Sequence, residues 1–251
     1  MRLAFISDIH ANLPAFEAVL ADLDRQKPDA VYCLGDLVSY APWPNEVIAL
    51  IRDRRIPTIM GNHDDELSRL APGQHLPTLD PSSATWVGAQ SLAFTHTILG
   101  SNERAYLAGL PRHLRLEFAL PTGWSNVLLV HGSPTSMTEY VLEDRPDNEL
   151  QTMLDKADAD ILLCGHSHLP YQRTLTFQTP DRSPYRYVIN TGSVGKPKDG
   201  DPRASYVLME WRRDGPQVRL VRVVYDVEKT AQAIEQGPLP DELARRLRRA
   251  Y

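Results

Sequence analysis

The stretch FISDIHANLPAFEAVL (residues 5–20) passes from a strand to a helix through two polar side chains. The run RLAFI (2–6) is short and apolar, which predicts a strand buried on both faces. Asp8 and His10 follow it directly, and apolar residues then recur at helical spacing from Leu13 to Leu23. A carboxylate and an imidazole at this junction indicate that the end of the strand opens into a site.

The same pattern of a short apolar run recurs along the chain. Further short apolar runs predict strands at AVYCL (30–34), IPTIM (56–60), NVLLV (126–130) and DILLC (160–164). Helical spacing separates several of them, and this alternation predicts a largely parallel sheet with helices on both faces. Between about 185 and 225, three more runs suggest antiparallel strands that add to a sheet edge or form a second layer: YRYVIN, ASYVLMEW and QVRLVRVVYD.

The length of 251 residues fits a single domain, 1–251. The proline-rich start of the region at about 65–113 and the helical stretch after it indicate a helical insertion or cap. The residues at about 227–251 predict C-terminal helices, interrupted at Gly237 and Pro238. The basic run RRLRRAY (245–251) is interpreted as a solvated helix face.

The composition is that of an ordinary globular chain, with 42% hydrophobic and 24% charged residues and a net charge of −5. No apolar run reaches the roughly 18 residues of a membrane helix, and the start has no secretory pattern. We therefore expect a cytoplasmic protein without a membrane partner. The mild acidic balance argues against a stable nucleic-acid complex. The sequence leaves the oligomeric state open.

Polar motifs stand at the ends of the five predicted strands: SDIH (7–10), GD (35–36), GNHD (61–64), HG (131–132) and GHSH (165–168). In an open α/β sheet, ligands bind in the crevice outside the carboxyl ends of the strands, so these motifs should converge. Residues i and i+2 of an extended chain point the same way, which would pair Asp8 with His10 and His166 with His168. Five of the eight histidines fall in these motifs.

The donor types indicate a metal centre. Imidazole nitrogens, carboxylates and one amide oxygen, without thiolates, suit manganese, iron or zinc better than a structural cysteine-bound zinc. Seven candidate ligands are too many for one tetrahedral ion, whereas two ions sharing the Asp36 carboxylate would use them all: Asp8, His10, Asp36, Asn62, His131, His166 and His168. Two divalent ions (+4) with Asp8 and Asp36 (−2) leave about +2, which attracts an anion such as a phosphate ester.

Taken together, D-x-H, G-D, G-N-H-D, a later H and G-H-x-H resemble the calcineurin-like metallophosphoesterase superfamily, in particular its longer bacterial and archaeal phosphodiesterase-like branch. The resemblance implies an α/β (α+β) fold, a two-layered β-sandwich flanked by helices, with a dinuclear centre. Glycine is common in that branch at the positions of Ser39 and Ala41. The arginine that follows G-D in protein Ser/Thr phosphatases is absent, which counts against that activity.

The resemblance also assigns roles to the motif residues. It implies a first metal at Asp8, His10, Asp36 and His168, and a second at Asp36, Asn62, His131 and His166. Manganese is the first expectation for both ions, with iron, zinc or nickel as alternatives. His63 would be the unligated histidine beside the substrate.

The leading hypothesis is a metal-dependent phosphoesterase that hydrolyses phosphodiester or nucleotide-type esters. A water bridging two metals about 3.5–4 Å apart would ionise to hydroxide and attack phosphorus in line. His63 would stabilise developing charge or protonate the leaving oxygen, with Asp64 orienting its ring and raising its pKa. A dinucleoside polyphosphate hydrolase and a non-catalytic metal-binding scaffold are the alternatives.

Three residues near the motifs have both a structural and a functional interpretation. Asp64 could instead cap the helix that follows it. Asn12 fits a helix N-cap and could also face the phosphate. Ser193, in a glycine-bearing loop, fits either a structural turn or a substrate contact.

Overall fold

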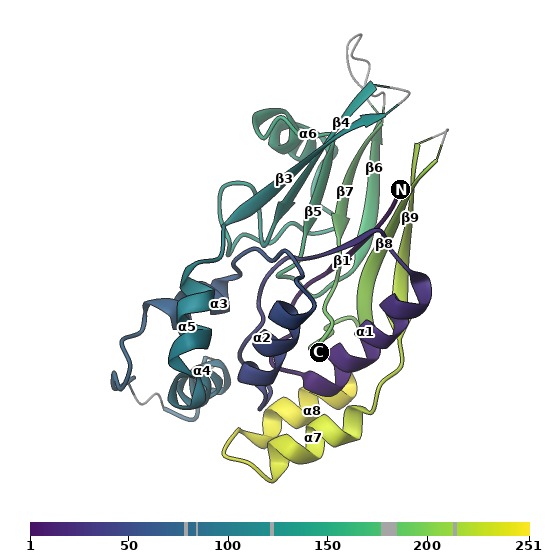
Figure 1. The fold of residues 1–251 in the computed structure, drawn as a ribbon. Coiled ribbons are helices and arrows are strands. Elements are labelled where there is room, and N and C mark those ends of the chain that lie inside the picture. Colours follow the sequence, from purple (N-terminus) through teal and green to yellow (C-terminus); the bar gives the residue numbers. More distant parts are fainter. Residues whose placement is uncertain (78–79, 84, 121–122, 177–184, 213–214) are drawn as a thin grey trace.

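The computed structural model describes residues 1–77, 80–83, 85–120, 123–176, 185–212 and 215–251, whose strands form two mixed sheets (Figure 1). The first has the order β2-β1-β8-β9, built from β2 (Ala30–Cys33), β1 (Arg2–Ile6), β8 (Ala204–Arg212) and β9 (Gly215–Val223). The second has the order β3-β4-β5-β7-β6, built from β3 (His113–Leu120), β4 (Gly123–Val130), β5 (Ile161–Cys164), β7 (Tyr185–Asn190) and β6 (Tyr171–Thr176).

The two-layered sandwich implied by the family resemblance is confirmed, whereas the largely parallel sheet is wrong. Parallel pairing is confined to β1 with β2 and to β5 with its neighbours β4 and β7. Strand β8 pairs antiparallel with β1, with Leu3 opposite Met209, and the hairpin partners β9, β3 and β6 also run antiparallel. Between the two strands of each of these hairpins the chain has too few residues for the long crossover that a parallel pair needs.

Helices cover the outer faces of the two sheets (Figure 1). Helices α1 and α2 lie on the first sheet and α6 on the second, while α3, α4 and α5 precede β3, and α7 and α8 close the chain. Their bounds are α1 (Leu13–Gln26), α2 (Pro44–Asp53), α3 (Asn62–Arg69), α4 (Trp86–Ile98), α5 (Ser101–Ala108), α6 (Asp147–Lys156), α7 (Val227–Glu235) and α8 (Asp241–Arg249). Within the described residues, no helix is long and apolar enough to cross a membrane.

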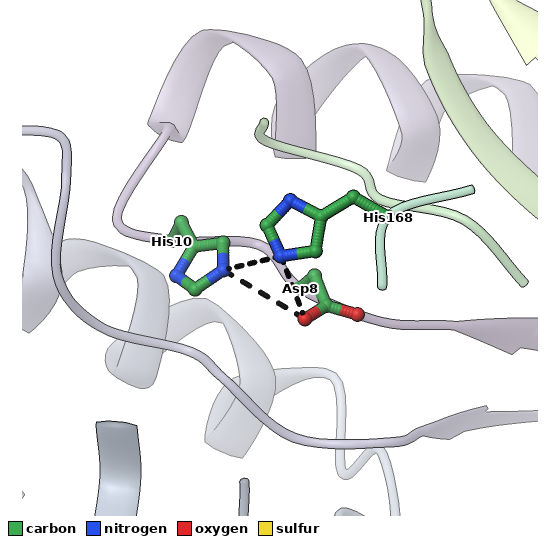
Figure 2. A group of neighbouring side chains, drawn as sticks. All are labelled: Asp8, His10 and His168. Carbon is green, nitrogen blue, oxygen red and sulfur yellow. Dashed lines mark hydrogen bonds and ion pairs between the residues drawn. The ribbon is translucent and has the colours of Figure 1, made fainter. Parts of the chain in front are cut away.

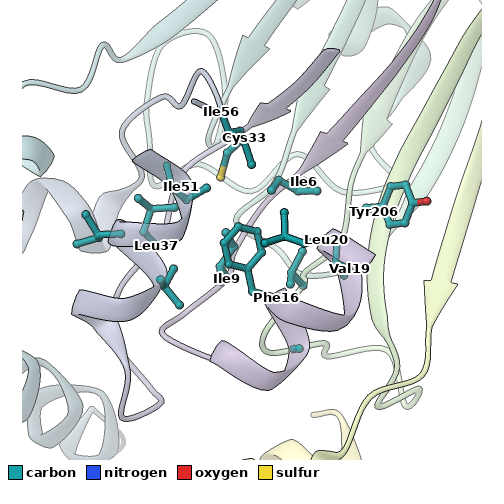
Figure 3. Close-up of a cluster of buried hydrophobic side chains, with 14 of the residues drawn as sticks. Ile6, Ile9, Phe16, Val19, Leu20, Cys33, Leu37, Ile51, Ile56 and Tyr206 are labelled. Atoms are coloured by element: carbon teal, nitrogen blue, oxygen red, sulfur yellow. The ribbon is translucent and has the colours of Figure 1, made fainter. Parts of the chain in front are cut away.

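Strand β1 shows why the sheets are layered. Its side chains alternate, so Leu3 and Phe5 enter the core between the sheets, while Ile6 joins the core beneath the helices. That second core includes Phe16 of α1 and Ile51 of α2, both fully buried (Figure 3). Complete burial of one such side chain contributes about 1.5–3 kcal/mol, so these contacts fix α1 against the sheet that carries Asp8.

Three sequence expectations need correction. IPTIM (56–60) forms no strand, only an isolated bridge between Cys33 and Thr58, because Pro57 lacks an N–H and α3 begins at Asn62. The predicted insertion at about 65–113 contains α4 and α5, but its last residue already begins β3, which the sequence did not predict. Strand β6 was also missed, since its exposed positions give it little apolar character.

Candidate metal centre

The motif residues meet where β1, β2, β4 and β5 end. Backbone hydrogen bonds continue the pairing of β1 with β2 beyond the strands, from Asp8 N to Gly35 O (3.0 Å) and from His10 N to Asp36 O (3.0 Å). In the second sheet, Gly165 N donates to His131 O (2.8 Å), and His166 N reaches across to Asp8 Oδ2 (3.1 Å). The site therefore joins the two sheets at one edge of the sandwich.

Five of the candidate ligands have a left-handed backbone, with φ between 49° and 63°: Asp8, His10, Asp36, His166 and His168. The expected extended geometry is therefore wrong: Asp8 and His10 do lie in one ligand group, but His166 and His168 lie in different groups. A left-handed residue costs roughly 1–2 kcal/mol, and such strain persists where the surrounding structure imposes it, commonly at functional sites. The loops thus turn the ligands inward at a conformational cost.

Two glycines allow the loops to meet. A Cβ atom on Gly61 would lie 2.1 Å from Asp36 Oδ1, and one on Gly35, where φ is +91°, would lie 2.4 Å from Gly61 N. Only residues without a side chain let these two backbones approach so closely. The glycines of G-D and G-N-H-D are therefore required by the contact between the two loops.

The first ligand group comprises Asp8, His10 and His168 (Figure 2). The Nε2 atoms of His10 and His168 are 3.1 Å apart, and Asp8 Oδ1 lies 3.2 Å from Nε2 of His168 and 3.7 Å from Nε2 of His10. All three side chains are buried. Three donor atoms thus converge on one small volume.

The second group comprises Asp36, His131 and His166. Nε2 of His131 lies 3.3 Å from Asp36 Oδ2 and 3.0 Å from Asn62 Oδ1, so the amide joins this group. Asp36 Oδ2 also lies 3.7 Å from Nε2 of His10 in the first group. Its position between the two groups is the one required of a carboxylate that bridges two cations.

Hydrogen bonds fix which ring nitrogen of each histidine faces inward. Nδ1 bonds a backbone carbonyl in His10 (Val38 O, 2.9 Å), His131 (Leu34 O, 2.8 Å) and His168 (Lys196 O, 2.5 Å). Because a carbonyl only accepts, Nδ1 carries a proton in each of these rings, and Nε2 faces the site. In His166 the roles of the two nitrogens are reversed. Nε2 donates to Thr138 O (3.1 Å), so Nδ1 is the nitrogen that remains to bind a cation.

This arrangement fits bound cations. Burial lowers the pKa of His10, and lowers that of His168 to about 4, so both rings are neutral near pH 7. Their two Nε2 lone pairs then face each other at 3.1 Å, which is repulsive unless a cation lies between them. Asp8 Oδ1, buried and without a hydrogen-bond donor, supplies a third ligand atom. The residues present therefore fit a divalent metal ion.

In the second group, a proton on His131 supplies the positive charge that a metal ion would supply when bound. Burial opposes charge on His131, but the Asp36 carboxylate raises the pKa of His131 to about 10. Despite burial, His131 and neighbouring imidazoles hold the pKa of Asp36 well below its usual range. A metal ion binding here would displace the proton and neutralise the carboxylate in its place.

Comparison with known proteins places these features in a family. The model of the calcineurin-like phosphoesterase superfamily domain matches residues 1–214. This chain belongs to that superfamily. An uncharacterised protein of Methanocaldococcus jannaschii is 31% identical over 260 residues, which cover 98% of this chain and 96% of that protein. The phosphodiesterase YfcE of Escherichia coli is 25% identical over 222 residues, covering 84% and 88%.

Solved structures agree with the fold. A metallophosphoesterase from Sphaerobacter thermophilus matches with a TM-score of 0.76 and 31% identity, over 100% of this chain and 99% of that chain. A hypothetical protein from Pyrococcus horikoshii matches with a TM-score of 0.81 and 22% identity over 98% and 97%, which shows the shared fold. The family implies divalent metal ions, and the two ligand groups provide places for them.

Within this superfamily fold, His63 lies beside the ligand groups. Its ring centroid is 5.3 Å from that of His10 and 4.9 Å from that of Tyr40, and its backbone N–H donates to Asp36 Oδ1 (2.9 Å). Its Nδ1 is buried and has no hydrogen-bond partner. The ring as a whole is only half-buried, so part of it remains accessible beside the centre.

The predicted partnership between Asp64 and His63 is not present. The Asp64 carboxylate accepts hydrogen bonds from Asp36 N (2.8 Å), Leu37 N (3.0 Å) and Gly61 N (3.0 Å). It thus caps α3 and ties the G-D loop to the G-N-H-D loop, which is the alternative that the sequence left open. Burial and the charge of Asp36 raise the pKa of Asp64 to about 7.

The side chains of Asn12 and Ser193 are bonded to protein atoms and are not open to a substrate. Asn12 caps α1 through Ala15 N, donates to Gly195 O and Tyr225 Oη, and is fully buried. Ser193, also fully buried, donates to Asp8 O (2.7 Å) and accepts from Lys196 N (2.7 Å). The geometry favours the cap and the turn over the two substrate contacts, because neither side chain reaches the surface.

Two tyrosines and two lysines beside the centre were missed by the sequence analysis. Tyr40 packs edge-on against His10, with centroids 4.7 Å apart, and Tyr140 stacks on His166 at 4.4 Å. Lys196 and Lys198 follow Ser193 in the same loop. The repeated lysine in GKPK was a usable signal, since it lies in the glycine-bearing loop that the sequence had singled out.

Proposed function

We propose that this protein is a dinuclear metal-dependent phosphoesterase that hydrolyses phosphodiester or nucleotide-type phosphate esters. The observation that carries the proposal is the convergence of histidine ring nitrogens on two adjacent carboxylate-containing groups, with Asp36 between them. Membership of the superfamily supports hydrolase activity. Two divalent cations are proposed, with manganese as the first expectation.

The chain would hold the first cation at Asp8, His10, Asp36 and His168, and the second at Asp36, Asn62, His131 and His166. When bound, the cations supply Lewis-acid stabilisation of phosphate charge and activation of a water nucleophile. The carbonyl partners of the histidine Nδ1 atoms keep the ligand nitrogens aimed inward while substrate binds. This rigidity means that the site needs little reorganisation during the reaction.

His63 is the proposed residue that acts on the substrate. Its backbone N–H is anchored on Asp36, so the ring is held beside the centre without serving as a ligand in either group. The half-buried ring can donate a hydrogen bond to phosphate or a proton to the leaving oxygen. The preference for diesters is supported by the similarity to a relative named as a phosphodiesterase.

The test is metal-dependent hydrolysis of bis-p-nitrophenyl phosphate beside p-nitrophenyl phosphate. Chelator-treated protein is assayed after Mn²⁺, Fe²⁺, Zn²⁺, Ni²⁺ or Mg²⁺ is restored, and bound metal is measured by plasma spectrometry. Faster cleavage of the diester supports the proposal. No turnover in protein shown to bind two ions, on these esters and on a set of nucleotides, favours the scaffold alternative.

A matched pair of variants tests the dinuclear geometry. Asp36→Asn should lower the metal content toward fewer than two ions and abolish most turnover, because the bridging oxygen loses its charge. Asp24→Asn, on the surface beside Arg54, should keep two ions and full activity. Full metal content in Asp36→Asn would contradict the bridging role.

A further inference from the structure

The loop between β4 and α6 is anchored on both sides of Tyr140. Two residues before it, Thr138 O accepts a hydrogen bond from His166 Nε2 (3.1 Å). Directly after it, Val141 is buried, and its carbonyl accepts a hydrogen bond from Tyr171 Oη (2.8 Å) at the start of β6. These contacts fix the backbone of Tyr140 beside the second ligand group without using its own side chain.

A series of three aromatic rings leads from this ligand group to the surface. The ring centroids of His131 and His166 are 5.2 Å apart, and the Tyr140 ring stacks on His166 at 4.4 Å with the two planes 15° apart. His131 is fully buried, His166 is half-buried, and Tyr140 is 52% exposed. The series therefore ends at an aromatic side chain that is open to solvent next to a proposed metal ligand.

Tyr140 has binding capacity that the protein itself does not use. The near-parallel contact with His166 covers one face of the ring, and half of the side chain remains accessible. Within the described residues, the hydroxyl takes part in no hydrogen bond. Tyr251, the other strongly exposed tyrosine of the described chain, differs because it donates to Glu242 (2.9 Å) and lies under the Arg246 guanidinium.

Support of His166 does not by itself explain this exposed ring, because the bond to Thr138 O already orients the imidazole. Apolar surface is also concentrated here. Of the eight large hydrophobic side chains that are exposed among the described residues, three lie in the two loops that meet at His166: Tyr140, Leu142 and Leu169. A flat aromatic group of a ligand would bury the free face of Tyr140, and offset stacking of two rings is favourable beyond the area that it buries.

We propose that Tyr140 is a platform on which a nucleobase of the substrate stacks while the phosphate of the same nucleotide lies at the metal centre. The inference rests on the proposed function, because the phosphate is taken to bind at the cations. It makes nucleotide diesters, in preference to alkyl phosphodiesters, the substrate class. Stacking accepts purines and pyrimidines alike because every base has a π-face, and the free hydroxyl of Tyr140 can bond a polar edge of the base or ribose.

The kinetic test compares two diesters that differ only in the base. One is the methyl ester of adenosine 5′-phosphate, and the other carries a 1-methoxy group in place of adenine. We expect kcat/KM of the wild type to be about tenfold or more higher for the adenosine ester. This ratio should fall to near one in Tyr140→Leu, whereas Tyr140→Phe, which keeps the ring, should keep most of it.

The ratio of the two substrates separates stacking from a structural role. A change that only disturbed His166 or the bound metal would lower turnover of both diesters alike and leave the ratio unchanged. Tyr251→Leu, which removes a tyrosine that is 48% exposed, is the matched control and should keep the wild-type ratio. The proposal is overturned by a wild-type ratio near one, by an unchanged ratio in Tyr140→Leu, or by an equal fall in Tyr140→Phe, which would assign the effect to the hydroxyl.

A binding measurement distinguishes failure of this inference from failure of the proposed function. If neither diester is hydrolysed, both serve as ligands in calorimetry of the manganese-loaded protein. We expect Kd to be about tenfold lower for the adenosine ester, and this difference to be lost in Tyr140→Leu and kept in Tyr251→Leu. In that case the proposed hydrolysis fails and the platform stands. Equal Kd values for the two diesters in the wild type overturn the platform.

Discussion

Replacement of Asp64 by Asn distinguishes a residue that holds two loops together from one that orients a catalytic histidine. Asp64 Oδ2 accepts hydrogen bonds from Asp36 N and Gly61 N, and Oδ1 accepts one from Leu37 N. An asparagine can keep its oxygen toward the first two donors, but its amide nitrogen then faces the N–H of Leu37. One buried donor is left without an acceptor, and two bonds lose their charge assistance.

The magnitude follows from these contacts. An unsatisfied buried donor costs about 1–3 kcal/mol, and the two weakened bonds add to this loss. Removal of a charge beside Asp36 offsets part of it, because that charge and burial together raise the pKa of Asp64 to about 7. We expect a net loss of about 2 kcal/mol in the free energy of unfolding, which lowers Tm by roughly 4–8 °C in a chain of this size.

Urea unfolding of the chelator-treated protein measures this loss, and bis-p-nitrophenyl phosphate hydrolysis at saturating metal measures catalysis. Asp65→Asn is the control, because its ion pairs with Arg69 and Arg112 lie at the surface and contribute less than about 1 kcal/mol. The reasoning is refuted if Asp64→Asn keeps wild-type stability while kcat falls a hundredfold. Asp64 would then act through His63.

Three further predictions concern other residues of the site. His63→Asn should lower kcat roughly a hundredfold with two metal ions retained, and loss of metal would mean that His63 is a ligand instead. Asn12→Ala should destabilise the fold by about 2 kcal/mol with KM unchanged, since Asn12 is fully buried and its side chain is hydrogen-bonded to protein atoms. A raised KM at wild-type stability would restore the substrate contact. Between pH 6.5 and 4 the unfolded metal-free chain binds a proton at His168 that the folded chain excludes, so stability should fall by about 3 kcal/mol as pH falls. Urea unfolding across this range measures the slope, and an equal slope in His168→Asn would contradict the assignment.

The candidate ligands could be predicted from the sequence because metal binding demands particular donor atoms. Few side chains offer an imidazole nitrogen or a carboxylate, so their grouping after successive apolar runs indicates a site before any geometry is known. Local patterns also predicted α1, α2 and the antiparallel strands β8 and β9, since their periodicity is contained within each segment. The roles of Asp64 and Ser193 were less accessible, because a carboxylate or hydroxyl serves a backbone N–H as readily as a substrate.

The sequence by itself determined the candidate donor set of this protein and four of the strands that precede it, because both depend on residue type and short-range spacing. Only the tertiary structure decided that the strands divide between two mixed sheets and that left-handed turns aim the ligands inward. It also decided which nitrogen of each histidine faces the centre, through carbonyls as distant in sequence as Leu34 is from His131. The position of the lysines beside His168 was likewise decided only by the tertiary structure. Their surroundings arise from segments that meet only after folding, and hydrogen bonding and charge depend on those neighbours.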